Sequence, residues 1–374
     1  MERRPKRNTD EKEEAPLVVV ERPSVIPVDF LHSGSTMLNL ALSNKGAKGG
    51  WARGRVVNPV GHGAAGKTLT ALELAAWCFY NILGSTSHNF PKVTKSEIIY
   101  NNVEGVMDFP VDMMYGKRFY EEVILNSIRT GTIEAFARDF FRRLKDLKSG
   151  HFLLYIIDTW DALDTEAEYE EFADSIKKNK PLEGSFNLGK QAFASKRFFK
   201  TLCSEIEGTD GNVNKDCTLM IVSQTRQKIG VTFGERNYRA GGDALNFYTH
   251  QVPWLRESEK LKQTSLGEKF VNGVSVHANV KRNKTALPFR EAKFDILFNK
   301  GIDDVTSMIK WIWGPEAKVV EFDGKNFAPK PRYENLVEYV ERNDLEGELV
   351  RLSEEKWWKI ERTISPNRKR RYPD

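Results

Sequence analysis

The sequence GHGAAGKT at residues 61–68 limits the possible folds of this chain more than any other feature. It fits the pattern G-x-x-x-x-G-K-[ST], in which a glycine-rich loop joins a strand to a helix and holds phosphate oxygens with backbone N–H groups. The apolar run RVVNPV precedes the loop, and a long apolar-periodic helix begins at Thr68. A glycine-rich turn that matches by chance is the alternative. We expect nucleotide contacts from Gly61, His62, Gly63, Ala64, Ala65, Gly66, Lys67, Thr68 and Leu69.

Three side chains near this motif have predicted chemical roles. Lys67 would reach the β- and γ-phosphates of ATP and is a catalytic candidate, and the Thr68 hydroxyl would bind Mg²⁺. A second contact to Mg²⁺, through water, is predicted for Asp158, which ends the apolar run FLLYIID. Asp158 could instead cap the following helix.

A further carboxylate follows the apolar run EIIYNNV. Glu104 at this position could orient and deprotonate the attacking water, since phosphoryl transfer depends mostly on positioning and charge stabilisation. On the residues alone, a plain surface acid is an equal interpretation of Glu104.

Apolar runs alternate with helical patterns from residue 55 to about 300, which is typical of an α/β fold with a mainly parallel sheet flanked by helices. Two alternating runs, VSVHANVKRN at 274–283 and REAKFDILFN at 290–299, predict an antiparallel continuation. The predicted organisation is an N-terminal tail with a short strand, LVVVE, and a possible role in oligomerisation (1–33), an ATPase core (34–301), a small C-terminal α+β domain (302–365) and a basic tail (366–374).

Composition bounds the class of protein. Hydrophobic residues make up 40% of the 374 residues, which excludes wholesale disorder. The three cysteines have neither metal-site nor disulfide spacing, and no run of about 18 apolar residues exists, so we expect a cytoplasmic protein without a membrane partner. The net charge of +5 is compatible with nucleic acid but does not demonstrate it.

The stretch SQTRQKIGVTFGERNYRAGGDALNFY, residues 223–248, follows the buried run CTLMIV directly. It contains cations and glycines but almost no aliphatic anchor. A loop of this length inside a compact domain is usually functional or disordered.

These motifs together resemble the RecA family of bacterial and phage DNA strand-exchange recombinases. The likeness runs from about 34 to 300. It rests on SGSTMLNLAL, GHGAAGKT, NNVEG and YIIDTWDAL, and above all on 223–248 and VKRNKTALPFREAKFDILFNKGI, which are similar to the second DNA-binding loop and the segment after it. The resemblance implies a RecA-like P-loop ATPase core, with ATP and Mg²⁺ as cofactors.

The resemblance also implies roles for the stretch at 223–248. Gln224 would be the glutamine that senses the γ-phosphate and passes its state to the loop. The implied DNA-binding residues are Arg226, Lys228, Ile229, Gly230, Val231, Arg236, Arg239, Gly241 and Gly242. An ordinary disordered surface loop is the alternative. Residues 164–190 take the place of the first DNA loop but are longer and more charged, so no residue there is assigned.

Further positions match the family by resemblance. Arg282 and Lys284 match two cations that reach the ATP of the neighbouring subunit, as an arginine finger does; a solvated basic strand end is the alternative. Asp108 matches an adenine-contacting acid, and Tyr115 is a candidate for stacking on the base.

The chain also departs from the family pattern. The amphipathic N-terminal helix has no clear counterpart in residues 1–30, Asn246 stands where a lysine is usual, and Leu69 replaces a threonine. The tail NRKRRYPD is basic where many members are acidic. The chain is therefore more similar to phage-encoded (UvsX/RecA-like) members.

The leading functional hypothesis is an ATP-dependent recombinase that forms a homo-oligomeric helical filament on single-stranded DNA and exchanges it with homologous duplex DNA. Single-strand-binding and loader proteins are further possible partners. The alternatives are a ring helicase or DNA motor on the same core, and a non-catalytic mediator that binds ATP and DNA.

Overall fold

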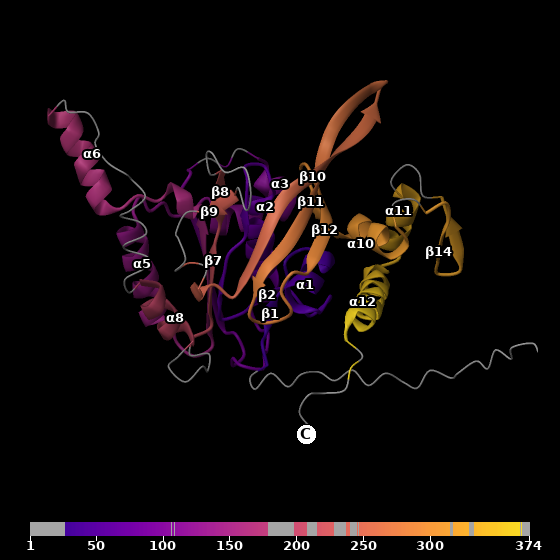
Figure 1. Ribbon diagram of the computed structural model, residues 1–374, viewed down its shortest axis with the longest axis horizontal. Helices are drawn as coiled ribbons and strands as arrows, with labels where there is room; N and C mark the ends of the chain where they lie inside the picture. The colour runs from indigo at the N-terminus through magenta and orange to yellow at the C-terminus, as the bar shows by residue number, and fades with distance from the viewer. Residues whose placement is uncertain are drawn as a thin grey trace, which may run out of the picture.

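Figure 1 shows the protein as a computed structural model. The structure describes residues 27–105, 107, 109–178, 198–207, 215–227, 237–239, 245, 247–314, 317–328, 333–366 and 368. The predicted strand at 17–21 and most of the basic C-terminal tail lie outside these residues.

The main sheet dominates the fold. Its strands are β3 (Val56–Val57), β4 (Val60–Gly61), β5 (Lys95–Asn102), β6 (His151–Asp158), β7 (Cys217–Ile221), β8 (Ser223–Gln227), β9 (Asn237–Arg239), β10 (Gln251–Ser265), β11 (Glu268–Asn283), β12 (Glu291–Leu297) and β13 (Gly301–Asp303). Their order is β13-β12-β11-β10-β3-β7-β6-β5, while β4 pairs with β10 and β8, and β8 also pairs with β9.

The pairing directions confirm the predicted sheet. Strands β5, β6, β7 and β3 are parallel to their neighbours, and β10 is parallel to β3 and β4. From β10 to β13 all pairs are antiparallel, which includes the continuation expected from the two alternating runs. The carboxyl ends of the parallel strands therefore meet at one edge of the sheet, where ligands of such folds bind.

Helices cover both faces of the sheet. The described helices up to residue 207 are α1 (Thr36–Ser43), α2 (Lys67–Asn81), α3 (Val111–Tyr115), α4 (Lys117–Phe119), α5 (Ile133–Asp146), α6 (Glu166–Lys178) and α8 (Phe199–Glu207), with a π-turn, η1 (Tyr120–Ile124), and a 3₁₀ turn, η2 (Trp160–Ala162). A separate two-stranded sheet pairs β1 (Phe30–Leu31) with β2 (Trp51–Ala52).

The burial of both faces of β6 explains why its residues 152–157 form a continuous apolar run. Phe152, Leu154 and Ile156 join the core that packs under α1 and α2, whereas the intervening Leu153, Tyr155 and Ile157 join the core under α5 and α8. A strand buried on both faces needs a continuous apolar run rather than an alternating one.

The C-terminal region has an apolar core of its own. It contains α10 (Asp304–Trp313), β14 (Val320–Phe322), β15 (Lys325–Phe327), α11 (Glu334–Arg342) and α12 (Glu346–Ile364). Met308, Phe322 and Leu336 belong to this core, but Trp357 of α12 packs into the core of the main sheet. Helix α12 therefore holds the C-terminal region against the main sheet, and the predicted boundary at 302 remains a prediction.

Two features project from the body of the molecule (Figure 1). Strands β10 and β11 form a long hairpin that turns at Leu266 and Gly267, both with positive φ, and Leu266 is fully exposed. Helix α6 extends on the other side, and none of its described side chains is buried. Among the described residues, no helix is long and apolar enough to cross a membrane.

Candidate functional site

Four candidate residues lie at the carboxyl ends of neighbouring strands. Gly61 ends β4, Glu104 follows β5, Asp158 ends β6 and Gln224 lies in β8, directly after β7. Gly61 and Gln224 are paired residues in the parallel β4–β8 ladder, and Asn102 is paired with Asp158 between β5 and β6. The sheet therefore brings these four sequence-predicted positions to one edge.

The backbone of the phosphate loop explains two of its glycines. A Cβ at Gly61 would lie 2.6 Å from the carbonyl oxygen of Leu255 in β10. Gly66 has φ +82°, and a Cβ there would lie 2.7 Å from Cδ1 of Ile296. A side chain at either position would push the loop away from the sheet.

The loop ends at the N-terminus of α2, which lacks a competing anion. Gly66 is the N-cap, no side chain caps the helix, and its first turn contains no acid. The first N–H groups of a helix have no intrahelical acceptor and carry partial positive charge, so this terminus is suited to a phosphate.

Lys67 is buried among acids. It is 5% exposed, and its Nζ donates a hydrogen bond of 2.5 Å to the His62 carbonyl oxygen. Burial lowers the pKa of Lys67, whereas the nearby Asp158, Glu104 and Asp161 carboxylates raise it. One buried cation facing three acids leaves room for further positive charge, such as a divalent metal ion.

Asp158 has the features of a residue that helps to hold such an ion. Its Oδ2 accepts a 2.6 Å hydrogen bond from the Tyr100 hydroxyl, while its Oδ1 is buried without a hydrogen-bond partner among the described residues. Burial raises the pKa of Asp158, and the Tyr100 and Thr68 hydroxyls oppose that rise. Hard oxygen donors of this kind fit Mg²⁺, which usually keeps several waters in proteins.

Glu104 stands at the centre of a small polar network. Its Oε1 accepts hydrogen bonds from Thr159 Oγ1 at 3.1 Å and from Gln224 Nε2 at 2.7 Å. The side chain is exposed. Glu104 is therefore held by Thr159, directly after β6, and by Gln224 in β8, while its side chain stays open to a water molecule.

Strand β8 is attached to this network at a second point, which sequence reasoning missed. The backbone N–H of Gln224 donates a 2.6 Å hydrogen bond to Asp161 Oδ2, just after β6. The second acid in the run DTWDAL was the available signal for Asp161. Gln224 is thus held at both its backbone and its side chain.

Comparisons with known proteins agree with this arrangement. A family model described as RecA N-terminal domain matches residues 147–303. The chain is 30% identical over 307 residues to Protein RecA of Sulfurimonas denitrificans, covering 81% of this chain and 75% of that protein. The chain belongs to the RecA family. It is also 28% identical over 328 residues to Protein RecA of Trichodesmium erythraeum, covering 84% of this chain and 76% of that protein.

The family membership confirms the resemblance drawn from the sequence motifs. The stretch at 223–248, which is expected to bind DNA in this RecA family member, is only partly among the residues that the structure describes. Lys228, Ile229, Gly230, Val231, Arg236, Gly241 and Gly242 lie outside the described residues, as do Asn246 and the adenine candidate Asp108. Arg226 has a described backbone in β8 but no described side chain. The DNA-binding roles of these residues stay predictions.

Arg239 is the member of this set whose surroundings are described, and they do not suit a DNA contact. It pairs with Thr225 across β8 and β9 and is only 6% exposed. Burial lowers the pKa of Arg239 to about 9, although the nearby Asp161 carboxylate raises it. Assigning Arg239 as a surface phosphate ligand does not fit this arrangement, because its guanidinium lies inside the protein, near an acid.

Arg282 and Lys284 lie at the end of β11. Arg282 Nη2 and Lys284 Nζ both donate to the carbonyl oxygen of Phe247, at 3.3 and 2.9 Å. Arg282 is paired with Val252 at the start of β10, whereas Gly61 of the phosphate loop is paired with Leu255. Three residues of strand separate these levels by roughly 10 Å.

Tyr115 is occupied by a structural contact. Its hydroxyl donates a 3.0 Å hydrogen bond to Glu73 of α2, and its ring packs edge-on against Phe119. Stacking of Tyr115 on a nucleotide base would require it to leave this contact. Leu69 also packs against the main core.

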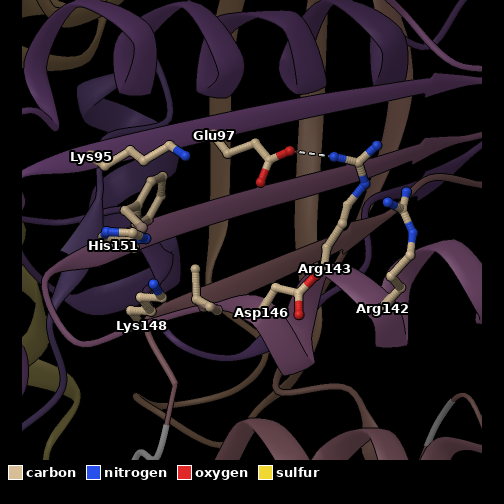
Figure 2. A pocket seen from close by; sticks show the side chains of 9 residues that line it. Lys95, Glu97, Arg142, Arg143, Asp146, Lys148 and His151 are labelled. Atoms are coloured by element: carbon tan, nitrogen blue, oxygen red, sulfur yellow. Dashed lines mark hydrogen bonds and ion pairs between the residues drawn. The ribbon is translucent and has the colours of Figure 1, made fainter.

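A cavity of about 250 Å³ lies far from this site (Figure 2). It is lined by Lys95, Glu97, Arg142, Arg143, Asp146, Leu147, Lys148, His151 and Phe152, and Glu97 forms an ion pair with Arg143. Lys95 and His151 begin β5 and β6, whereas Glu104 and Asp158 lie at or beyond their other ends. Eight residues of strand place this cavity roughly 25 Å from the edge of the sheet that carries Glu104 and Asp158.

Proposed function

We propose that this chain is an ATP-dependent DNA recombinase that forms helical filaments on single-stranded DNA and promotes homologous pairing and strand exchange. Membership of the RecA family supports a RecA-like recombinase with ATPase activity. The observation that carries the finer proposal is the 2.7 Å hydrogen bond between Gln224 and Glu104. It joins the candidate water-activating acid to the strand that leads into the predicted DNA-binding segment.

ATP and Mg²⁺ are the proposed cofactors. The N–H groups of the loop and of the α2 N-terminus would hold the phosphates, with Lys67 as the cation at the β- and γ-phosphates. Thr68 and Asp158 would hold Mg²⁺, Asp158 through water. The metal ion would neutralise charge on the transferred phosphoryl group.

Glu104 would act as the base for hydrolysis. Its exposed carboxylate can accept a proton from a water molecule, and the Thr159 hydroxyl holds it in position. The amide of Gln224 occupies the same oxygen, Oε1, so a shift of β8 changes the position or basicity of the base. DNA bound beyond β8 could thereby alter the hydrolysis rate, and the nucleotide could alter DNA affinity.

The proposed site is shared between subunits. Arg282 and Lys284 lie roughly 10 Å behind the level of their own phosphate loop along β10, so a neighbouring subunit is the better acceptor for them. In a helical homo-oligomer they would stabilise charge at the neighbour's ATP. Such a shared site would make ATP turnover depend on assembly.

Electron microscopy tests the assembly. With single-stranded DNA and a slowly hydrolysed ATP analogue, we expect helical filaments, and with homologous duplex DNA and ATP we expect strand exchange. Closed rings with ATP-driven unwinding would identify a helicase or motor instead. Binding of ATP and DNA without DNA-stimulated turnover would identify a mediator.

Mixing two inactive variants tests the shared site. Lys67→Ala protein mixed with Arg282→Ala/Lys284→Ala protein should recover part of the ATPase activity, because some mixed interfaces pair an intact loop with intact cations. No recovery at any ratio, with both variants folded and co-assembling, would contradict sites shared between subunits. The phage-encoded origin expected from the sequence stays a prediction.

A further inference from the structure

His62 of the phosphate loop contacts strand β8 directly. Its ring Nδ1 lies 2.8 Å from the Thr225 hydroxyl oxygen, a hydrogen-bond distance whose donor depends on the tautomer of the imidazole. The carbonyl oxygen of the same residue accepts the 2.5 Å hydrogen bond from Lys67 Nζ. One residue therefore touches both the phosphate-binding cation and the strand that leads toward the predicted DNA segment.

The position of this contact follows from the sheet. Val60 pairs with Ser223 and Gly61 pairs with Gln224, so His62 and Thr225 are the next residues along the two parallel strands. Successive side chains of a strand point to opposite faces. Gln224 and Thr225 therefore reach two different walls of the nucleotide site, Gln224 toward Glu104 and Thr225 toward the phosphate loop.

We infer that His62 and Thr225 are positioning residues that form a second link between nucleotide and DNA, separate from the Gln224–Glu104 link. This inference rests on the proposed function, because it assumes that ATP and single-stranded DNA affect each other's binding. The phosphate loop itself, and not only the catalytic acid, contacts β8 through this pair.

The geometry gives a physical route for this link. When phosphates attract Lys67 Nζ, the His62 carbonyl loses a charge-assisted hydrogen bond. The peptide after it can reorient, because Gly63 follows and a Cβ there would meet nothing within 4 Å. A change in the backbone conformation of His62 moves its ring, and the ring is hydrogen-bonded to the Thr225 hydroxyl. Strand β8 then shifts together with the phosphate loop. On its other side β8 pairs with β9.

The measurement is the ratio of dissociation constants for a fluorescent oligo-dT without and with a slowly hydrolysed ATP analogue. Thr225→Val removes the hydroxyl but keeps a β-branched side chain suited to a strand. One hydrogen bond is worth enough to lower the ratio roughly two- to tenfold. Thr225→Ser keeps the hydroxyl and should restore most of the wild-type ratio, which a merely structural role in packing would not predict.

A double-mutant cycle completes the test. If the two side chains act through one hydrogen bond, His62→Ala/Thr225→Val should lower the ratio no further than His62→Ala alone. Overturning results are a wild-type ratio in Thr225→Val, an equal loss in Thr225→Ser, or additive losses in the cycle. A ratio of one in the wild-type protein would instead contradict the proposed function, and this inference with it.

Discussion

Two segments leave the edge of the sheet that carries Glu104 and Asp158, and they differ in their contacts with the candidate site. Helix α6 follows β6 in the place of the first predicted DNA loop, and β8 follows β7 at the start of the second. Helix α6 contains five acids and two lysines, and none of its described side chains is buried. Strand β8 is joined to the site by hydrogen bonds from Gln224 to Glu104 and Asp161 and by the contact between Thr225 and His62.

A position beside the candidate nucleotide site does not by itself create coupling. A segment responds to bound nucleotide only if its contacts differ between the two states of the site. Strand β8 contacts the phosphate loop and two acids of the candidate site, so bound nucleotide can change its contacts. The acidic surface of α6 also repels DNA phosphates, whereas the stretch after Gln224 is rich in cations. We therefore propose that ATP–DNA coupling passes through β8 and not through α6.

The largest expected effect is on hydrolysis. Glu104→Gln should keep ATP binding but slow DNA-stimulated hydrolysis by about 10² to 10⁴-fold, because the amide cannot accept the proton of the attacking water. Steady-state phosphate release and equilibrium binding of a fluorescent ATP analogue measure the two properties.

Helix α6 supplies the matched control for that change. Glu171→Gln makes the same chemical substitution on an exposed acid of α6, and it should leave the hydrolysis rate unchanged. Equal slowing by both variants, or none by Glu104→Gln, would remove the distinction between the two segments.

A smaller effect is expected on DNA affinity. Arg226→Ala should weaken single-strand binding at every sequence and reduce the salt slope by about 0.7, the value for one lost phosphate contact on single strands. Lys177→Ala removes one exposed cation from α6 and should change neither quantity. Fluorescence anisotropy over a range of salt concentrations distinguishes them, and a reversed result would place the DNA contact on α6.

The smallest effect concerns stability. Tyr169, Phe172 and Ile176 form an apolar stripe on α6, but they are 64%, 46% and 64% exposed. Phe172→Ala should change the free energy of unfolding by no more than about 0.5 kcal/mol, as expected for a surface position. Phe140→Ala, on the buried face of α5, should cost about 3 to 5 kcal/mol. Urea unfolding of both variants measures this, and a large loss in Phe172→Ala would mean that α6 packs against another surface.

Much of the fold could be predicted because local pattern and tertiary role agree. The apolar run of β6 is buried on both faces, and the loop at 61–68 needs its glycines where β10 and β12 approach. The hairpin of β10 and β11 was not predicted. Its outer half is mostly exposed, so it lacks the apolar alternation that identifies a strand packed on a core.

The site was predictable where a residue type is tied to a motif. Lys67, Glu104, Asp158 and Gln224 all reach the expected edge of the sheet. The burial of Arg239, the Glu73 contact of Tyr115 and the link between His62 and Thr225 depend on which side chains meet across separate strands. That information is set by tertiary packing, and no spacing in the sequence contains it.

One titration series tests most directly whether ATP and DNA communicate through β8. We expect the slowly hydrolysed ATP analogue to tighten oligo-dT binding by wild-type protein by about 5- to 150-fold, the usual range of coupling between sites. Gln224→Ala should lose most of this tightening, and Gln224→Ala/Thr225→Val should bind oligo-dT equally well with and without the analogue. A double variant that is folded, binds both ligands and keeps the wild-type ratio would contradict the assignment of coupling to β8.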